Sequence, residues 1–133
     1  MGYGMQQRDG HFRIAVEKLP AALLAVQAIT EQKPREWGGS HFSSGMTVPE
    51  MLEAWSWKAL CDPATGDLID LVFFGKQLGA EAFLFQALAP FVDAGSYLEM
   101  LGEDGEFWRW AFDGQHMREQ FPQGVRQRRI LWE

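Results

Sequence analysis

Apolar residues recur every three or four positions between residues 19 and 29, which is the spacing of one face of an α-helix. The positions are Leu19, Ala22, Leu23, Val26 and Ile29. Pro20 falls in the first turn, where its missing N–H leaves no hydrogen bond unmade. The pattern predicts an amphipathic helix that begins near residue 19 and ends before Pro34.

Two more helices are predicted further along the chain. Thr47-Val48-Pro49-Glu50 has the pattern of a capping box, in which a threonine and a later glutamate satisfy the first free N–H groups. This box predicts a short helix from residue 48 to residue 56. Another helix is predicted over residues 80–91, where Pro90 ends or kinks the last turn. Its expected buried stripe is Phe83, Leu84, Ala87, Leu88 and Phe91.

Short runs of alternating or branched apolar residues predict strands between turn signals such as Asp-Gly pairs. Arg8-Asp9-Gly10 is interpreted as a turn between two strands, and residues 62–67 as a hairpin loop. Asp104-Gly105 and Asp113-Gly114 are interpreted as the tight turns of a C-terminal β-meander. The expected strands cover residues 3–7, 11–15, 57–61, 68–74, 96–101, 106–112, 115–121 and 125–132.

From residue 11 onward the predicted order is strand, helix, short helix, strand, strand, helix and strand. Without the short helix this is βαββαβ, the ferredoxin-like order, followed by the C-terminal β-meander. We therefore expect an α+β fold: a two-layer sandwich of a mainly antiparallel sheet with helices on one face. A length of 133 residues is that of a single globular domain, here 1–133.

The two tight turns of the meander set a predicted register. With two loop residues in each turn, Glu99 lies opposite Trp110 and Trp108 lies opposite Glu119. Both tryptophans and both glutamates then share one face, and Arg109 lies on the other. A slip of one residue would exchange the faces. Two interpretations of the exposed face are open. Either Trp rings and the stems of Arg side chains simply cover it, or it forms a platform for a cation or a basic partner.

Residues 34–46 form the longest stretch without a periodic pattern, and they are rich in glycine and serine. Trp37 and His41 lie in this loop. Long loops within compact domains are often functional. The alternative is a crossover whose aromatic side chains fix it to the body of the protein.

The composition narrows the classes of function. A formal charge of −6 and a pI near 5.0 disfavour binding to nucleic-acid phosphates, and they suit either a basic protein partner or plain solubility. Hydrophobic residues make up 47% of the chain, which is too apolar for a disordered protein. The chain has six Trp, ten Phe and two Tyr. We expect so many aromatic side chains to leave at least one tryptophan partly exposed.

Few residues are arranged for catalysis or metal binding. His11, His41 and His116 lie far apart in the sequence, and the single Cys61 excludes an internal disulfide framework. Carboxylate pairs are available, but such pairs are common on exposed strand edges. No apolar run is long enough to cross a bilayer, and the first residues do not resemble a secretory signal. The sequence therefore predicts a cytoplasmic protein that is not an enzyme and has no metal, cofactor, membrane or nucleic-acid partner.

Three sequence blocks resemble a family of small bacterial and phage-associated hypothetical proteins. The blocks are MGYGMQQRDGHFRI, EKLPAALLAVQAI and FVDAGSYLEMLGEDGEFWRWAFDG. The last is the most specific, because an acidic tight turn is followed by alternating tryptophans. The three blocks cover 51 of the 133 residues, and the resemblance implies a bacterial or phage origin in the cytoplasm. The family has no assigned activity, so the resemblance transfers no catalytic residue.

Three hypotheses of function are open. The first is an interaction module that binds and modulates another protein, as an immunity protein or a phage counter-defence protein does. Its candidate partner-binding residues are Trp108, Trp110, Arg109, Glu99, Glu119, Trp37 and His41. The second is a homodimeric structural protein. The third is a small-ligand binder or enzyme with a pocket between the sheet and the loop at residues 34–46.

Overall fold

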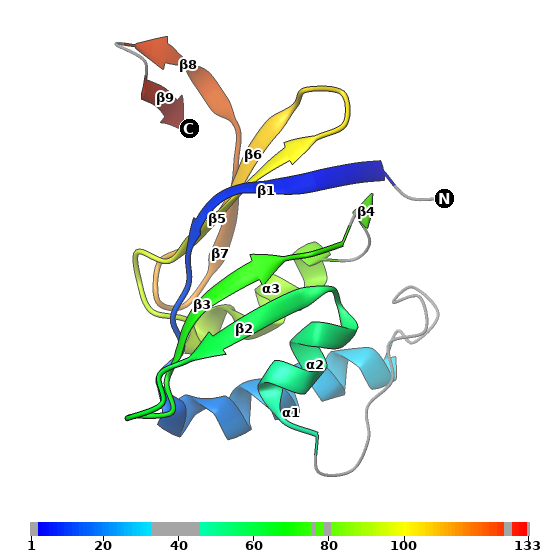
Figure 1. The fold of residues 1–133 in the computed structure, drawn as a ribbon, viewed down its shortest axis with the longest axis vertical. Coiled ribbons are helices and arrows are strands. Elements are labelled where there is room, and N and C mark those ends of the chain that lie inside the picture. Colours follow the sequence, from blue (N-terminus) through cyan, green and yellow to red (C-terminus); the bar gives the residue numbers. More distant parts are fainter. Residues whose placement is uncertain (1–2, 33–45, 76, 79–80, 127–128, 133) are drawn as a thin grey trace.

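The computed structural model describes residues 3–32, 46–75, 77–78, 81–126 and 129–132, which form an α+β fold (Figure 1). The helices are α1 (Leu19–Gln32), α2 (Val48–Ala54) and α3 (Glu81–Leu88), with 3-10 turns at Val16–Lys18 and Ala89–Phe91. The strands are β1 (Tyr3–His11), β2 (Trp57–Cys61), β3 (Leu68–Phe73), β4 (Gln77–Leu78), β5 (Tyr97–Gly102), β6 (Phe107–Phe112), β7 (Met117–Gln120), β8 (Pro122–Arg126) and β9 (Arg129–Trp132).

Strand β1 lies where the two main parts of the sheet structure meet. It belongs to a five-stranded sheet of order β4-β1-β5-β6-β7, in which every neighbouring pair is antiparallel. Strands β2 and β3 form a separate antiparallel hairpin that lies beside β1 (Figure 1). The predicted ferredoxin-like order is wrong. That order would place the β2–β3 hairpin in the same sheet as β1, whereas β2 and β3 form a sheet of their own and the ladder partners of β1 are β4 and β5.

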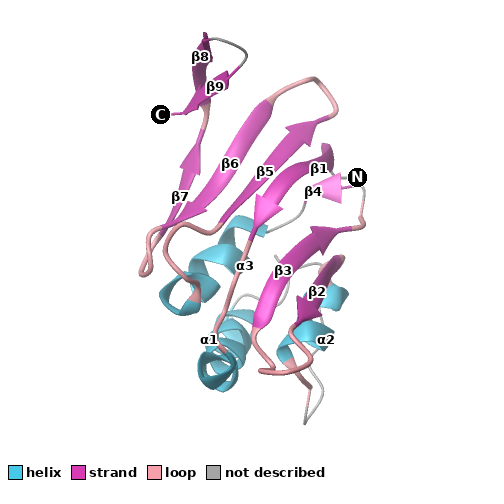
Figure 2. Ribbon diagram, turned by 60° about the vertical axis from the view of Figure 1, so that its left-hand side comes forward, coloured by secondary structure: helices cyan, strands magenta, loops and turns pink. Residues whose placement is uncertain are grey.

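The core lies between the helices and the inner faces of the strands (Figure 2). Its centre is a set of three aromatic rings from three elements: Trp57 of β2, Phe85 of α3 and Trp110 of β6. The ring centroids of Trp57 and Phe85 are 5.2 Å apart, and those of Phe85 and Trp110 are 5.1 Å apart. Trp57 also meets Trp110 edge-on at 6.4 Å. These contacts join the β2–β3 hairpin to the five-stranded sheet.

The predicted helices are confirmed, with one error in the buried stripe of α3. The capping box of α2 forms as expected: the Thr47 side chain accepts from the Glu50 N–H, and the Glu50 side chain accepts from the Thr47 N–H. In α3, however, Phe85 is fully buried and Phe83 is exposed. The reason is the wide aromatic core, which takes a residue just outside the predicted stripe.

The predicted turn at residues 8–10 is wrong, because β1 is one continuous strand. Its register against β5 shifts between Gln7 and Asp9, so Arg8 is an extra residue in a β-bulge. The Asp9 carboxylate accepts from the Gly10 N–H at 2.8 Å. The Asp-Gly pair therefore marks a bulge within a strand and does not reverse the chain.

A glutamine side chain links the two sheets. Gln7 Nε2 donates to the carbonyl oxygen of Leu71 at 3.0 Å, and Gln7 Oε1 accepts from the Phe73 N–H at 2.8 Å. Further along, Ile14 and Leu68 exchange two backbone hydrogen bonds, each of 2.9 Å. The amide of Gln7 thus satisfies β3 backbone groups in place of a continuous main-chain ladder.

The last predicted strand, over residues 125–132, is instead part of a hairpin of β8 and β9. Pro122 pairs with Trp132 and Arg126 with Arg129. Pro122, which falls between the predicted strands at 115–121 and 125–132, is the first residue of β8, a position that proline tolerates in strands. In both views the hairpin projects from one end of the molecule (Figures 1 and 2).

Replacing Gln7 should weaken the attachment of the β2–β3 hairpin. Gln7→Ala removes both hydrogen bonds and leaves a donor and an acceptor of β3 without their partner. We expect it to lower the free energy of unfolding by about 1–3 kcal/mol. Urea denaturation followed by tryptophan fluorescence measures this loss. The control is Gln6→Ala, an exposed neighbour on the opposite face of β1. Equal stability of the two variants would contradict the role assigned to Gln7.

An ion-pair cluster holds three chain segments together. Arg13, beyond the end of β1, contacts Asp93 and lies 2.7 Å from Asp67. Asp67 also accepts from the Val16 N–H at 2.7 Å. This backbone hydrogen bond, helped by Arg13, holds the pKa of the Asp67 carboxyl below its usual value.

Because the folded pKa of Asp67 is lowered, its contribution to stability is complete above the unfolded pKa of about 3.9 and is lost as the pH falls through the folded pKa. Asp67→Asn should therefore flatten the acid side of a plot of unfolding free energy against pH. Glu106→Gln, a carboxyl exposed in a turn, serves as the control and should leave that slope unchanged. Parallel acid limbs for wild type and Asp67→Asn would refute this assignment.

Candidate functional site

The two tryptophans of the predicted binding platform lie in the core. Trp108 is 5% exposed and Trp110 is 1% exposed. The predicted register of β5 and β6 is wrong by one residue: Leu98 pairs with Trp110, and Glu99 pairs with Arg109. An exchange of faces on β5 is the result, so Glu99 and the tryptophans point to opposite sides of the sheet.

The turn between β5 and β6 explains the slip. Gly102 still pairs with Glu106, because the Gly102 N–H donates to the Glu106 carbonyl at 2.7 Å. The loop therefore has a third residue, and Gly105 closes it with a φ of 85°. A left-handed glycine at this position is typical of three-residue hairpin loops. The register of β6 and β7 differs from the predicted one by two positions, so each residue of β7 stays on its predicted face.

Glu99 and Arg109 lie together on the outer face of the sheet, within a cluster of charged and aromatic side chains. This Glu99 cluster consists of Arg8, Tyr97, Glu99, Phe107, Arg109 and Trp132. Glu99 is only 5% exposed, although none of the described helices covers this face. Arg8 Nη1 lies 2.9 Å from one carboxylate oxygen of Glu99, and Arg109 contacts the other.

Aromatic rings surround both arginines of the cluster. The guanidinium of Arg8 lies 5.0 Å from the centre of the Phe107 ring. That of Arg109 lies 4.6 Å from the rings of both Tyr97 and Trp132. Because its two oxygens face two arginines, Glu99 is compensated within the protein and is not a free site for a cation of a partner.

Tyr97 extends the cluster toward β1. Its hydroxyl donates to the Asp9 carboxylate at 3.1 Å. Burial raises the pKa of Tyr97, and the bond to Asp9 raises it further. The Glu99 cluster therefore connects β1, β5, β6 and β9, and its hydrogen bonds and ring contacts act to hold these strands in place.

The remaining sequence-predicted residues do not join this cluster. Glu119 pairs with Trp110 across β6 and β7, so it lies on the opposite face from Glu99, where it is exposed. Trp37 and His41 lie outside the described residues. Trp132 is half-buried, which confirms that at least one tryptophan is partly exposed.

Sequence reasoning missed an apolar surface on the β2–β3 hairpin. This hairpin patch consists of Leu60, Ile69, Val72 and Phe74, whose exposed fractions lie between 41% and 56%. The register pairs Lys58 with Val72 and Leu60 with Asp70, so all four of these residues lie on the outer face. Phe74 lies on the same face because it is two positions from Val72. Ile69 is the extra residue of a β-bulge in β3, because Asp70 pairs with Leu60 and Leu68 pairs with Cys61. A solvated face of an antiparallel sheet is normally polar.

A signal for the hairpin patch was present in the sequence. Residues 68–74 read Leu-Ile-Asp-Leu-Val-Phe-Phe, with apolar side chains at both odd and even positions. Such a strand is apolar on both faces, and its side chains are shielded from solvent only if other elements cover both faces. In the structure the inner face, with Leu71 and Phe73, packs on the core and the outer face does not.

A hollow of ≈ 370 Å³ adjoins the hairpin patch beside α2. Its described lining includes Pro49 and Glu53 of α2, Lys58 and Ala59 of β2, and Phe74. Its walls thus combine a proline and a phenylalanine ring with one carboxylate and one ammonium group. A single side chain of a binding partner fits a space of this size.

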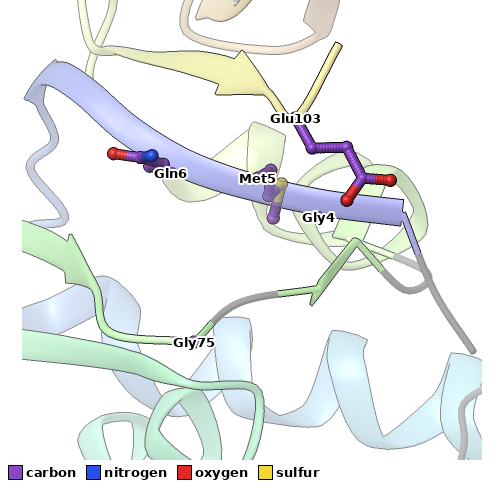
Figure 3. Close-up of a pocket in the computed structure, with 5 residues that line it drawn as sticks. All are labelled: Gly4, Met5, Gln6, Gly75 and Glu103. Carbon is purple, nitrogen blue, oxygen red and sulfur yellow. The ribbon is translucent and has the colours of Figure 1, made fainter.

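A second hollow, of ≈ 440 Å³, lies where β1 and the end of β3 diverge (Figure 3). Its described lining is Gly4, Met5, Gln6, Gly75 and Glu103. Glu103 lies against Gly4, where an added Cβ would come within 2.7 Å of its carboxylate oxygen. Glu103 is the one titratable side chain of this described lining, so the lining offers no acid–base pair for catalysis.

Two general features of the described part of the chain bear on function. No three His, Cys, Asp or Glu side chains among the described residues gather as a set that could hold a metal ion. No described helix is long and apolar enough to span a bilayer.

Comparisons with protein-family models, curated proteins and solved structures give no match to this chain. The resemblance to small bacterial and phage-associated proteins therefore stays a prediction. Any function must be argued from the surface of the molecule itself.

The Glu99 cluster makes a direct prediction for stability. Glu99→Gln keeps the shape of the side chain but removes the charge that Arg8 and Arg109 share. We expect a loss of about 1–3 kcal/mol in the free energy of unfolding. Glu119→Gln, exposed on β7, should change it by less than about 0.5 kcal/mol. Urea unfolding of both variants tests the difference, and similar losses would show that Glu99 has no special structural role.

Proposed function

We propose that the protein is a small interaction module that binds a basic protein through the hairpin patch and acts by binding rather than by catalysis. The observation that supports this most directly is the exposure of Leu60, Ile69, Val72 and Phe74 on one face of one hairpin. Contiguous exposed apolar side chains are costly in water, and they mark interaction surfaces in soluble proteins.

The charge around the hairpin patch favours a basic partner. The segment from residue 47 to residue 74 has one basic side chain, Lys58. Its carboxylates are Glu50, Glu53, Asp62, Asp67 and Asp70, of which Asp67 is already paired with Arg13. An apolar centre with a charged rim is the common anatomy of a protein interface. Negative charge at the rim attracts a positively charged partner over a distance and disfavours acidic ones.

The hollow beside α2 supplies a place for an anchoring side chain. Glu53 and the Phe74 ring both line it. A carboxylate next to an aromatic ring suits an arginine or lysine, which gains from the ion pair and from the ring face. Arginine is among the residues that most often anchor protein interfaces.

A partner of this kind fits both an immunity-like role and a phage counter-defence-like role. The two differ in the identity of the basic partner, a toxin in one case and a host defence protein in the other. An adjacent toxin gene would favour immunity, and a position within a prophage would favour counter-defence.

The proposal predicts that binding depends on the hairpin patch and not on exposed apolar residues in general. The test variant is Leu60→Ser combined with Val72→Ser, and the control is Leu24→Ser on α1, where the leucine is 66% exposed. Affinity capture from a lysate of the source organism identifies the partner, and calorimetry with the purified partner measures the dissociation constant. We expect the double variant to weaken binding at least about 100-fold, because a hot-spot residue contributes 2 kcal/mol or more.

Cys61 gives an independent readout. It is the single cysteine of the chain and is exposed at the end of β2, next to Leu60 in the sequence but at a position on the opposite face, so a flexible crosslinker is used. A photo-crosslinker attached to its thiol should react with the captured partner in wild type and in Leu24→Ser. Capture that is equally strong in the double variant, with no crosslink from Cys61, would refute binding at this patch.

A further inference from the structure

The C-terminal hairpin has the character of an arm that needs a surface to pack on. It consists of β8 and β9, and it meets the body of the protein where the ring of Trp132 packs on Arg109. Phe121, at its base, is 36% exposed and Leu131 is 42% exposed. A two-stranded hairpin is only marginally stable in water without further packing.

The arm combines apolar and basic positions. Arg126 and Arg129 are register partners near its tip, and Leu131 is two residues from Arg129 on β9. Positions two residues apart on a strand share a face. One face of the arm therefore bears a leucine position beside two arginine positions, and the sequence carries no carboxylate between Phe121 and Trp132.

The hairpin patch has the complementary character. Its apolar centre matches the exposed leucine of the arm, and its carboxylate-rich rim matches the arginines. In a protein whose formal charge is −6, this arginine-bearing segment has the charge opposite to that of the acidic residues around the hairpin patch.

Geometry decides which copy of the patch the arm can reach. The arm lies at one end of the long axis of the molecule, and the β2–β3 hairpin, which carries the patch, lies in the other half (Figure 1). The five-stranded sheet lies between them. The arm of one molecule therefore cannot cover its own patch without leaving Arg109, but it can reach the patch of a second molecule.

We propose that the arm of one copy of the protein docks on the hairpin patch of a second copy. This inference rests on the patch assigned under the proposed function, and it makes a second copy a competitor of the basic partner. The contact joins two different surfaces, so it is heterologous and builds a ring or an open chain. The protein would then store its binding surface in a self-associated form and release it when partner is present.

Self-association should depend on concentration and salt. Sedimentation velocity of the wild type should show an average mass that rises with protein concentration and falls as salt screens the charges. A wild type that stays monomeric at all concentrations and at low salt would overturn the inference.

Mixing two variants tests the heterologous geometry. Arg126→Glu with Arg129→Glu disables the arm, and Leu60→Ser with Val72→Ser disables the patch. Each variant alone should associate at least about tenfold more weakly than wild type, a difference of about 1.4 kcal/mol. An equimolar mixture should form dimers and nothing larger, because one intact arm meets one intact patch. Leu24→Ser should behave as wild type.

The same variants separate this inference from the proposed function. Circular dichroism checks that each variant folds, and Phe74→Ser replaces the patch variant if that one does not. A mixture that stays monomeric while wild type associates would refute the arm–patch contact. The arm variant keeps its patch and should still bind the basic partner, and more tightly than wild type at high protein concentration. Partner binding without self-association would leave the proposed function standing and overturn this inference alone.

Discussion

The packing of Trp57 and Trp110 against Phe85 is the interaction on which the arrangement of the molecule depends. These rings come from β2, β6 and α3, and they lie within 5.1–6.4 Å of one another. Through them the β2–β3 hairpin is fixed to the same core as the five-stranded sheet, although no continuous ladder joins the two. Because the inner face of the hairpin is committed to this core, its apolar outer face is left toward solvent. The position of the hairpin patch is thus a consequence of how the core is closed.

The sequence predicted local structure better than long-range structure, and the reasons are visible at particular residues. The capping box of α2 depends on Thr47 and Glu50, which are three positions apart, so the pattern contains all that is needed. The β5–β6 register depends on whether the turn has two or three residues, and the left-handed Gly105 decides this. The pairing of β1 with β5 joins residues about 90 positions apart. Nothing in the spacing of the segments shows that β1 extends a sheet with β4 and β5 while β2 and β3 form a sheet of their own.

The error in register reverses the interpretation of the candidate site. Tryptophans expected on a binding platform fill the core, and the glutamate expected to attract a partner is shared by Arg8 and Arg109. The surface of the proposed function was not recognised from the sequence, because Leu68–Phe73 resembles a fully buried strand. Whether such a strand is covered on both sides depends on which elements pack there, and that is a property of the tertiary structure.

The link that Gln7 makes between β1 and β3 also has a consequence for motion. Along this seam, the Ile14–Leu68 pair supplies main-chain bonds at one end and a side-chain amide supplies the bonds further along. A seam of this kind should open at a lower free-energy cost than a full ladder, so we expect α2, β2 and β3 to exchange their amide hydrogens without unfolding of the five-stranded sheet. The hairpin patch therefore lies on a part of the protein that we expect to adjust its shape to a bound partner.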